Sequence, residues 1–513
     1  MPPRKGFPKV KTGCRTCKLR KVKCDEVKPH CARCAAAGRQ CGGYDEAGVP
    51  QGLSWYRPRQ LTAHDEKEGR AFQFFSHMIG PVLSGPMDTY FWTHLVMQFS
   101  HFEPAVRHAV VAISSLYEDF HGGSRLMRQK CSNAFAISHY YSAIRRAKST
   151  GDEQLILLVC ILFICVEYLQ GNVQAALRHC QHGRLIINKD SCRSPWAREH
   201  LLPIFRRLGF IPFFFGSKVT PPVPDLTGFD TPVPITFTSI AQAQASLDEL
   251  RAQATRLHRT KDRSQQRSLL LSLDEWHCRL EELEAALSMS SPDELAVCTM
   301  RMEYEVSRIC ISHAFEPSET AFDLHLDNFQ LIVDLARRAS QLRQYELPEA
   351  VMPATSFTFE TGFLPLLYFV VIKCRHLQTR LEALAWMTEL SAAKESFLDV
   401  GTLYRVGHRL VEIEHDICLD DLGSILDITG ALLAPSEDKR VLDARVDHEI
   451  EPITEANGAV TYRRTVDFFM RDAAGQRFAR GEFITDARPR QRPVGLPNMR
   501  CARPIIEVCS EAV

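Results

Sequence analysis

The sequence predicts a mainly α fold: a small cysteine-rich module, then a large all-helical domain, with a small β-hairpin near the C-terminus. Three observations lead to this fold class. Six of the 18 cysteines fall within residues 14–41. Apolar residues recur at helical spacing from about residue 62 to 435, and the pattern then changes to alternation around residues 458–485. A chain of 513 residues is too long for one core, because domains usually hold about 100–200 residues.

Positive charge is concentrated at the N-terminus. Residues 1–41 hold 12 Lys or Arg against two acidic residues, a net charge of +10, whereas the rest of the chain carries −9. Residues 1–13 are interpreted as a basic disordered arm. A basic head on a mildly acidic body indicates that the head binds a polyanion.

Six cysteines stand at regular spacing behind this arm. They are Cys14, Cys17, Cys24, Cys31, Cys34 and Cys41. The intervening gaps of two, six, six, two and six residues make each half Cys-x2-Cys-x6-Cys, an internal duplication. Three thiolates per half are one short of tetrahedral zinc, but six satisfy two zinc ions if two thiolates bridge both metals. The spacing therefore predicts a two-zinc site in which each half completes the other.

Other interpretations of these cysteines fit less well. A disulfide framework needs an oxidising compartment, and no secretory signal opens this sequence. A metallothionein-like store would not need basic, patterned residues between its ligands. A ring-finger type of zinc module usually spaces its ligands more widely and includes His. DNA binding is favoured, and an adaptor whose zinc module binds protein or RNA is the alternative.

The charges indicate which half of the module contacts DNA. The first half carries five basic residues: Arg15, Lys18, Arg20, Lys21 and Lys23. The second half carries only Arg33 and Arg39. A short helix that starts near Cys17 would present several of the first set to one groove. Phosphate contacts would position it, and one or two side chains would read base edges.

The module resembles the fungal binuclear zinc cluster, a DNA reader that places a helix in the major groove. The six cysteines, the basic run from Lys18 to Lys23 and Pro29 carry the resemblance. It implies that Cys14 and Cys31 bridge the metals, with Cys17 and Cys24 completing one zinc site. Cys34 and Cys41 then complete the other. It also implies that Lys21 reads a CGG-type triplet and that Arg20 lies beside it, where the family uses the backbone carbonyl.

The resemblance extends into the rest of the chain. Four segments are similar to the helical regulatory region of many fungal regulators with this cluster: Leu83–Trp92, Glu103–Leu116, Glu167–Gly171 and Ile204–Leu208. It implies a zinc-dependent transcription regulator of the RNA polymerase II type, located in the nucleus. Its expected partners are double-stranded DNA and the transcription machinery.

The remaining elements follow in order. Residues 42–61 contain four Gly and two Pro without periodicity and are interpreted as a linker. Residues 62–435 form the helical regulatory domain, crossed by a stretch with six prolines at 209–236. Residues 436–513 form a C-terminal tail. Within it, apolar residues flank Asp472-Ala-Ala-Gly475, which predicts the hairpin.

Dimerisation is an open hypothesis. Many proteins with this cluster follow it with a heptad coiled coil, and residues 42–61 contain no heptads. Apolar residues from Leu269 to Leu287 do alternate by four and three. That segment is shorter than three heptads, so an intramolecular helix pair is favoured over a homodimer.

Enzymatic and membrane functions are not indicated. The chain has no dinucleotide-binding, phosphate-loop or metalloprotease motif, and the expectation is that it is not an enzyme. The longest apolar run, Leu155 to Val166, has twelve residues, whereas a bilayer span needs about 18–20. This run is interpreted as a buried core helix, so no membrane association is expected.

Overall fold

A computed structural model describes residues 13–28, 30–43, 66–84, 89–121, 133–189, 194–209, 224–226, 231–287, 290–346, 356–419, 434–447, 451–454, 460–472 and 474–485. The chain divides into two compact units, unit 1 (Met1–Leu61) and unit 2 (Thr62–Val513). Three expectations fall wholly or mostly outside the described residues: the basic arm, the linker and the proline-rich crossing. The described parts of that crossing, residues 209, 224–226 and 231–236, contain no helix.

Unit 1 consists of two short helices connected by loops around the cysteines. These are α1 (Arg15–Leu19) and α2 (Ala32–Ala36). Each begins directly after a cysteine whose sulfur accepts a hydrogen bond from the backbone N–H three residues on, an N-cap made by a thiol. Helix α1 therefore starts at Arg15, earlier than the start near Cys17 expected from the sequence.

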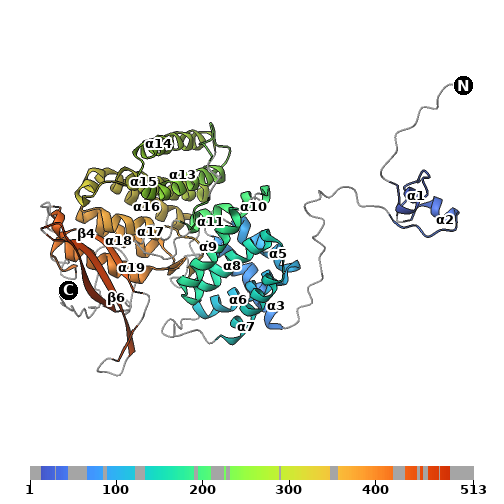
Figure 1. Ribbon diagram of the computed structural model, residues 1–513, viewed down its shortest axis with the longest axis horizontal. Coiled ribbons are helices and arrows are strands. Elements are labelled where there is room, and N and C mark those ends of the chain that lie inside the picture. The colour runs from blue at the N-terminus through green and yellow to red at the C-terminus, as the bar shows by residue number, and fades with distance from the viewer. Residues whose placement is uncertain are drawn as a thin grey trace. The chain divides into compact units, whose positions relative to one another are not determined.

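Unit 2 begins with a group of helices that surround α8 (Figure 1). The bounds are α3 (Glu66–Phe74), π-helix η1 (Phe75–Ile79), α4 (Gly80–Ser84), π-helix η2 (Phe91–Leu95), α5 (Val96–Phe102), α6 (Pro104–His121), α7 (Ala134–Lys148), α8 (Glu153–Gln170), α9 (Val173–Ile187), α10 (Pro195–His200) and α11 (Leu202–Leu208). Helix α6 starts at a proline, whose missing N–H is not needed in a first turn. Helix α8 ends at Gly171, which adopts a left-handed conformation with φ of 75°.

Helix α8 is long and apolar enough to cross a bilayer by length and composition alone, with 18 residues and a mean hydropathy of 1.9. In the fold, 72% of it is buried within unit 2. It extends beyond the apolar run noted in the sequence, from Glu153 to Gln170. Burial of this kind is typical of a core helix of a globular domain.

The second part of unit 2 packs further helices into two cores. The bounds are α13 (Ile240–Thr260), α14 (Arg263–Ala286), α15 (Ser291–Ser312), 3-10 helix η5 (Glu319–His325), α16 (Leu326–Glu346), α17 (Leu364–Lys373), α18 (Leu377–Leu390) and α19 (Val400–His415). Five residues of the expected heptad stripe, from Leu269 to Leu283, lie buried in a core that α14 shares with α13 and α15. The Nε1 of Trp276 donates to the carbonyl of Ala243 on α13 at 2.9 Å. The stripe thus serves an intramolecular helix pair, as the sequence predicted.

Strands complete unit 2. The hairpin is formed by β6 (Val460–Arg471) and β7 (Arg477–Thr485), and Gly475 takes a φ of 77° in its turn. The sheet is larger than the sequence predicted, because β4 (Val441–Val446) and β5 (Glu451–Thr454) pair antiparallel with successive parts of β6. Strand β7 pairs with the other edge of β6. A second, small sheet joins β1 (Phe357–Thr358), β2 (Lys394–Glu395) and β3 (Leu398–Asp399), within the segment expected to be all helical.

The four-stranded sheet shares a hydrophobic core with the helices. Val441 of β4, Phe468 of β6 and Ile484 of β7 are buried in the same cluster as residues of α15 to α19. Helix α19 contacts β4 and β7, and Figure 1 shows this sheet beside the helices. The prediction of a mainly α fold with a C-terminal hairpin is confirmed, and the sheet is an integral part of the helical unit.

Glu395 of β2 is a buried carboxyl in this unit. Its Oε2 accepts hydrogen bonds from the N–H of Gly362 at 2.7 Å and of Leu364 at 3.2 Å, at the start of α17. Burial nevertheless raises its pKa to about 7. An unfolded Glu ionises near pH ~4.3, so between that pH and about 7 the folded state keeps a proton that the unfolded state loses. Glu395 therefore makes folding less favourable as pH rises through this window.

The variant Glu395→Gln keeps the size of the side chain and removes its titration. We expect its unfolding free energy, relative to that of the wild-type chain, to increase as pH rises from about 4 to about 7 and to level off above. Urea unfolding followed by helical circular dichroism at several pH values measures this difference. A difference that does not change with pH would contradict the buried, proton-retaining carboxyl.

Candidate metal centre and nucleic-acid interface

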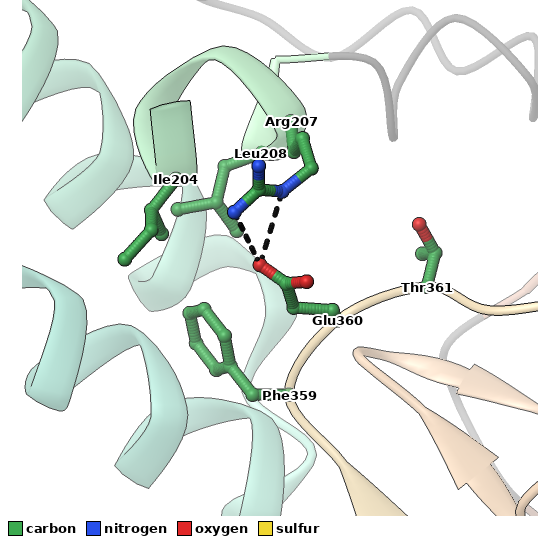
Figure 2. Close-up of a pocket in the computed structure, with 6 residues that line it drawn as sticks. All are labelled: Ile204, Arg207, Leu208, Phe359, Glu360 and Thr361. Carbon is green, nitrogen blue, oxygen red and sulfur yellow. Dashed lines mark hydrogen bonds and ion pairs between the residues drawn. The ribbon is translucent and has the colours of Figure 1, made fainter. Parts of the chain in front are cut away.

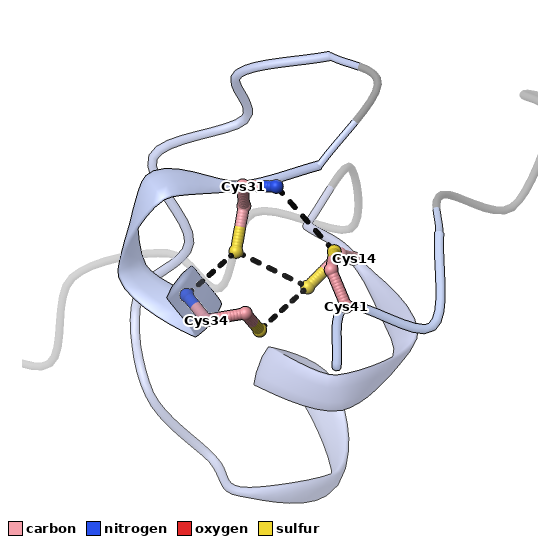
Figure 3. Close-up of side chains that lie close together, drawn as sticks. All are labelled: Cys14, Cys31, Cys34 and Cys41. Atoms are coloured by element: carbon pink, nitrogen blue, oxygen red, sulfur yellow. Dashed lines mark hydrogen bonds between the residues drawn. The ribbon is translucent and has the colours of Figure 1, made fainter. Parts of the chain in front are cut away.

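The six cysteines of unit 1 converge on one centre. Potential ligand sulfurs form two overlapping groups of four, each within 4.8 Å: Cys14, Cys17, Cys24 and Cys31, and Cys14, Cys31, Cys34 and Cys41. Both groups contain Cys14 and Cys31, the two residues that the resemblance gave as bridging (Figure 3). Sequence reasoning therefore found the residues that the structure brings together.

The spacing of the sulfur atoms suits tetrahedral zinc. The Sγ atoms of Cys14 and Cys31 are 3.6 Å apart, Cys17 and Cys31 are 3.7 Å apart, and Cys14 and Cys34 are 3.8 Å apart. Zinc–sulfur bonds of about 2.3 Å in a tetrahedron place neighbouring sulfurs about 3.8 Å from each other. The donor set and its geometry thus fit zinc.

Backbone N–H groups support the sulfurs in a repeated pattern. Cys17 donates to the sulfur of Cys14 at 3.3 Å, and Cys34 donates to that of Cys31 at 3.2 Å. The N–H of Cys31 likewise donates to the sulfur of Cys41 at 3.4 Å. This hydrogen bond lowers the pKa of Cys41 to about 7, whereas burial raises the pKa of Cys14 to about 12. A bound cation would hold such a buried sulfur as the thiolate.

Two side chains other than the cysteines form hydrogen bonds between the two halves of the module. They were not predicted from the sequence. The hydroxyl of Thr16 donates to the carbonyl of Gln40 at 3.2 Å and accepts from the N–H of Gly42 at 2.8 Å. The Nη1 of Arg33 donates to the carbonyl of Lys23 at 3.0 Å. Arg33 thus links the second half to the loop after α1. Hydroxyl and guanidinium groups at such positions gave no sequence signal.

The five expected DNA-contacting residues of the first half are exposed. They are Arg15, Lys18, Arg20, Lys21 and Lys23. The structure places them on α1 and in the loop that follows it. The neighbouring Leu19 is 84% exposed, so the basic surface includes an apolar side chain.

Lys21 lies beyond the end of α1 in a backbone conformation that lysine rarely adopts. Its φ is 56°, in the left-handed region. Its N–H donates to the carbonyl of Lys18 at 3.1 Å, and the N–H of Val22 donates to that of Cys17 at 3.1 Å, a Schellman-type end.

The second half repeats this helix end 17 residues later with a glycine in place of the lysine. Gly38 has a φ of 61°, and its N–H donates to the carbonyl of Ala35 at 3.0 Å. The N–H of Arg39 donates to the carbonyl of Cys34 at 3.0 Å. Glycine is the residue that this conformation favours. The first half therefore carries a lysine at a position where the backbone alone would favour glycine, and such strain is often stored at functional sites.

Comparisons with known proteins decide the family of the module. Residues 12–48 match the model of the fungal Zn(2)-Cys(6) binuclear cluster domain. These residues belong to that family. A domain of this family binds zinc, and the thiol cluster described above is suited to that metal. No solved structure gave a significant match to the chain.

Several transcription regulators are similar to parts of the chain. The Aspercryptin biosynthesis cluster-specific transcription regulator atnN of Emericella nidulans is 29% identical over 243 residues, 39% of this chain and 38% of that protein. Transcription regulator lscL of Purpureocillium lilacinum is 26% identical over 203 residues, 34% of this chain and 48% of that protein. A Zn(2)-C6 fungal-type transcription factor of Gibberella zeae is 56% identical over 41 residues, 8% of each chain. The chain thus covers less than half the length of each, and the first two similarities extend beyond the binuclear cluster domain.

A small hollow in unit 2 lies between α11 and the loop after β1 (Figure 2). Ile204, Leu208 and Phe359 line it, and both Nε and Nη2 of Arg207 donate to Oε1 of Glu360. Its volume is about 10 Å³, enough for about one water molecule.

Proposed function

We propose that this protein is a zinc-dependent, sequence-specific transcription regulator of the RNA polymerase II type that reads a CGG-like triplet in the major groove. The observation that carries the proposal is the thiol-capped helix α1 with its exposed basic residues, held on the six-cysteine centre. The names of the similar proteins favour this function over a zinc adaptor for protein or RNA. The nucleus is the compartment in which it would act, and double-stranded DNA is its main partner.

The metal content of unit 1 is proposed to be two zinc ions. Each overlapping group of four thiolates completes one tetrahedral site, and the shared sulfurs of Cys14 and Cys31 bridge the metals. Native mass spectrometry of residues 1–61 tests this number. Two zinc ions per chain agree with the proposal, and one zinc ion contradicts the bridged arrangement.

Unit 2 is proposed to regulate the DNA reader and to contact the transcription machinery. Its apolar stripe on α14 is buried within the unit, so a homodimer would need a different surface. The similar proteins are regulators, which agrees with the absence of enzyme motifs from the sequence.

Lys21 is proposed to read a base. The other basic residues of the first half are proposed to contact phosphates: Arg15, Lys18, Arg20 and Lys23. Arg20 does so with its side chain or contacts the DNA with its backbone carbonyl instead. The support for Lys21 is its left-handed position, which places the side chain just beyond the helix end at a cost in backbone conformation. A lysine that hydrogen-bonds the O6 and N7 of guanine is among the commonest specific contacts.

We expect Lys21→Ala to lose about 1–3 kcal/mol of discrimination at one position of the triplet. Lys21→Gly should lose the same discrimination although glycine suits the local backbone, as Gly38 does in the second half. Binding to matched and singly mismatched duplexes at several salt concentrations measures both effects.

Two control variants distinguish recognition of a base from electrostatic attraction to the DNA phosphates. Lys23→Ala should weaken binding to all sequences about equally and reduce the salt slope by about one. Arg39→Ala, in the half with few charges, should reduce DNA affinity less than Lys21→Ala or Lys23→Ala. If Lys21→Ala keeps its sequence preference and only loses affinity, Lys21 is a phosphate contact.

A further inference from the structure

Three helices of unit 2 bring together a group of potential metal ligands that the proposed function does not use. Glu68 lies on α3, His108 on α6 and His139 on α7. One ligand atom from each side chain lies within 4.8 Å of the other two. Helix α6 packs against both α3 and α7, and Figure 1 shows the three helices side by side.

The shortest distance within this group joins the two histidines. The Nδ1 atoms of His108 and His139 are 3.0 Å apart, and the Nε2 of His139 is 3.7 Å from Oε1 of Glu68. The second separation is too long for a hydrogen bond. Two nitrogens that each lie about 2.0–2.1 Å from one zinc ion can be 3.0 Å apart, so the two Nδ1 atoms suit a shared ion. The contact of Glu68 is to the other ring nitrogen of His139, so Glu68 belongs to the group through the 4.8 Å spread of the three ligand atoms and not through this contact.

The surroundings keep these ligands largely out of water. The side chains of His139 and Glu68 are 11% and 16% exposed. The ring of Phe135 lies against that of His139, with centroids 4.6 Å apart. Burial, together with the neighbouring His139 and Arg146, lowers the pKa of His108 to about 4. A neutral imidazole at physiological pH is the form that binds a metal.

We propose that Glu68, His108 and His139 bind a divalent transition-metal ion in unit 2, with zinc as the preferred ion. Two imidazoles and one carboxylate are a ligand set of open zinc sites, in which water occupies the fourth position. The ion would join α3 to the α6–α7 pair. Because only the folded unit assembles the three ligands, the ion would stabilise unit 2 against unfolding.

The test counts metal in the full chain. Wild type and the variants Glu68→Gln and His108→Gln are dialysed against zinc buffered at low micromolar free concentration, and bound zinc is measured by mass spectrometry. We expect each variant to hold one zinc ion fewer per chain than wild type. This difference does not depend on how many ions the six cysteines bind, so it stands apart from the test of unit 1.

Control measurements separate loss of the metal site from misfolding of a variant. His101→Gln, on α5 outside this group, should keep the wild-type count. Circular dichroism checks folding, and the conservative Glu68→Gln decides the matter if His108→Gln does not fold. In wild type, zinc should also raise the unfolding temperature of unit 2, and in Glu68→Gln it should not. Equal zinc counts in wild type and Glu68→Gln would overturn the proposal. An additional zinc ion that binds only at millimolar zinc would also overturn it. His108 and His139 would then form a hydrogen-bonded pair without a metal.

Discussion

Replacing Cys31 by Ala in the full chain is expected to abolish sequence-specific DNA binding, with a loss of affinity greater than 100-fold. Cys31 belongs to both groups of four sulfurs, so its loss leaves each zinc site one ligand short. The same residue caps α2 through its sulfur. Structural zinc supplies much of the folding free energy of such small modules, on the order of 10 kcal/mol in finger-like peptides.

A graded set of variants tests this effect by fluorescence anisotropy on one duplex. Cys41→Ala, which removes a ligand from only one group, should weaken DNA binding less than Cys31→Ala. Cys278→Ala changes an exposed cysteine of α14 and should leave binding unchanged. Affinity of Cys31→Ala close to that of wild type would show that Cys31 does not bridge the metals.

The variant Glu414→Gln is expected to destabilise unit 2 by about 3–5 kcal/mol, because it leaves two buried guanidinium groups without their shared carboxylate. Glu414 Oε2 accepts from Arg380 at 2.7 Å and Oε1 from Arg375 at 3.2 Å, and all three side chains are at most 1% exposed. Oε1 also accepts from the N–H of Val441 at 2.7 Å, which joins α19 to β4. Interaction with these two arginines keeps the pKa of Glu414 below its usual value despite its burial.

The matched control removes the charge of an exposed glutamate. Glu294 pairs with Arg338 at 2.7 Å, but the two side chains are 37% and 54% exposed. Glu294→Gln should therefore change the unfolding free energy by only about 0–1 kcal/mol. Urea unfolding of both variants at neutral pH measures the two changes in unfolding free energy. Equal losses of unfolding free energy would contradict a stabilising role for the buried cluster of Glu414, Arg375 and Arg380.

The parts of the fold that the sequence predicted are those set by local patterns. Pro104 begins a helix, where its missing N–H is not needed. The stripe from Leu269 to Leu283 is buried in an intramolecular helix packing, as expected. The turn around Gly475 joins two strands whose alternating apolar residues were visible in the sequence.

The strands that the sequence did not predict depend on distant partners. Strand β4 has the sequence Val-Leu-Asp-Ala-Arg-Val and β5 contains a proline, so neither shows a clear alternation. Both become strands because β6, further along the chain, offers an edge on which they pair. The strands β1, β2 and β3 have only two residues each, which is too short for any pattern.

The residues of the candidate sites also include some that could be predicted from the sequence and some that could not. The six cysteines could be predicted because metal chemistry fixes their number and spacing. The left-handed conformation of Lys21 could not be predicted from its own residue type, although its counterpart Gly38, 17 residues later, was a signal that the duplication made available. Glu68, His108 and His139 were missed because their proximity arises only when three separate helices pack.

We propose that a zinc-held module of this chain reads DNA sequence. Selection of bound duplexes from a random DNA pool by the zinc-loaded full chain tests it most directly. We expect the selected duplexes to share a CGG-like triplet and the enrichment to disappear when a strong chelator removes the zinc. Selection that yields no shared sequence, or one that is unchanged by chelation, would contradict it.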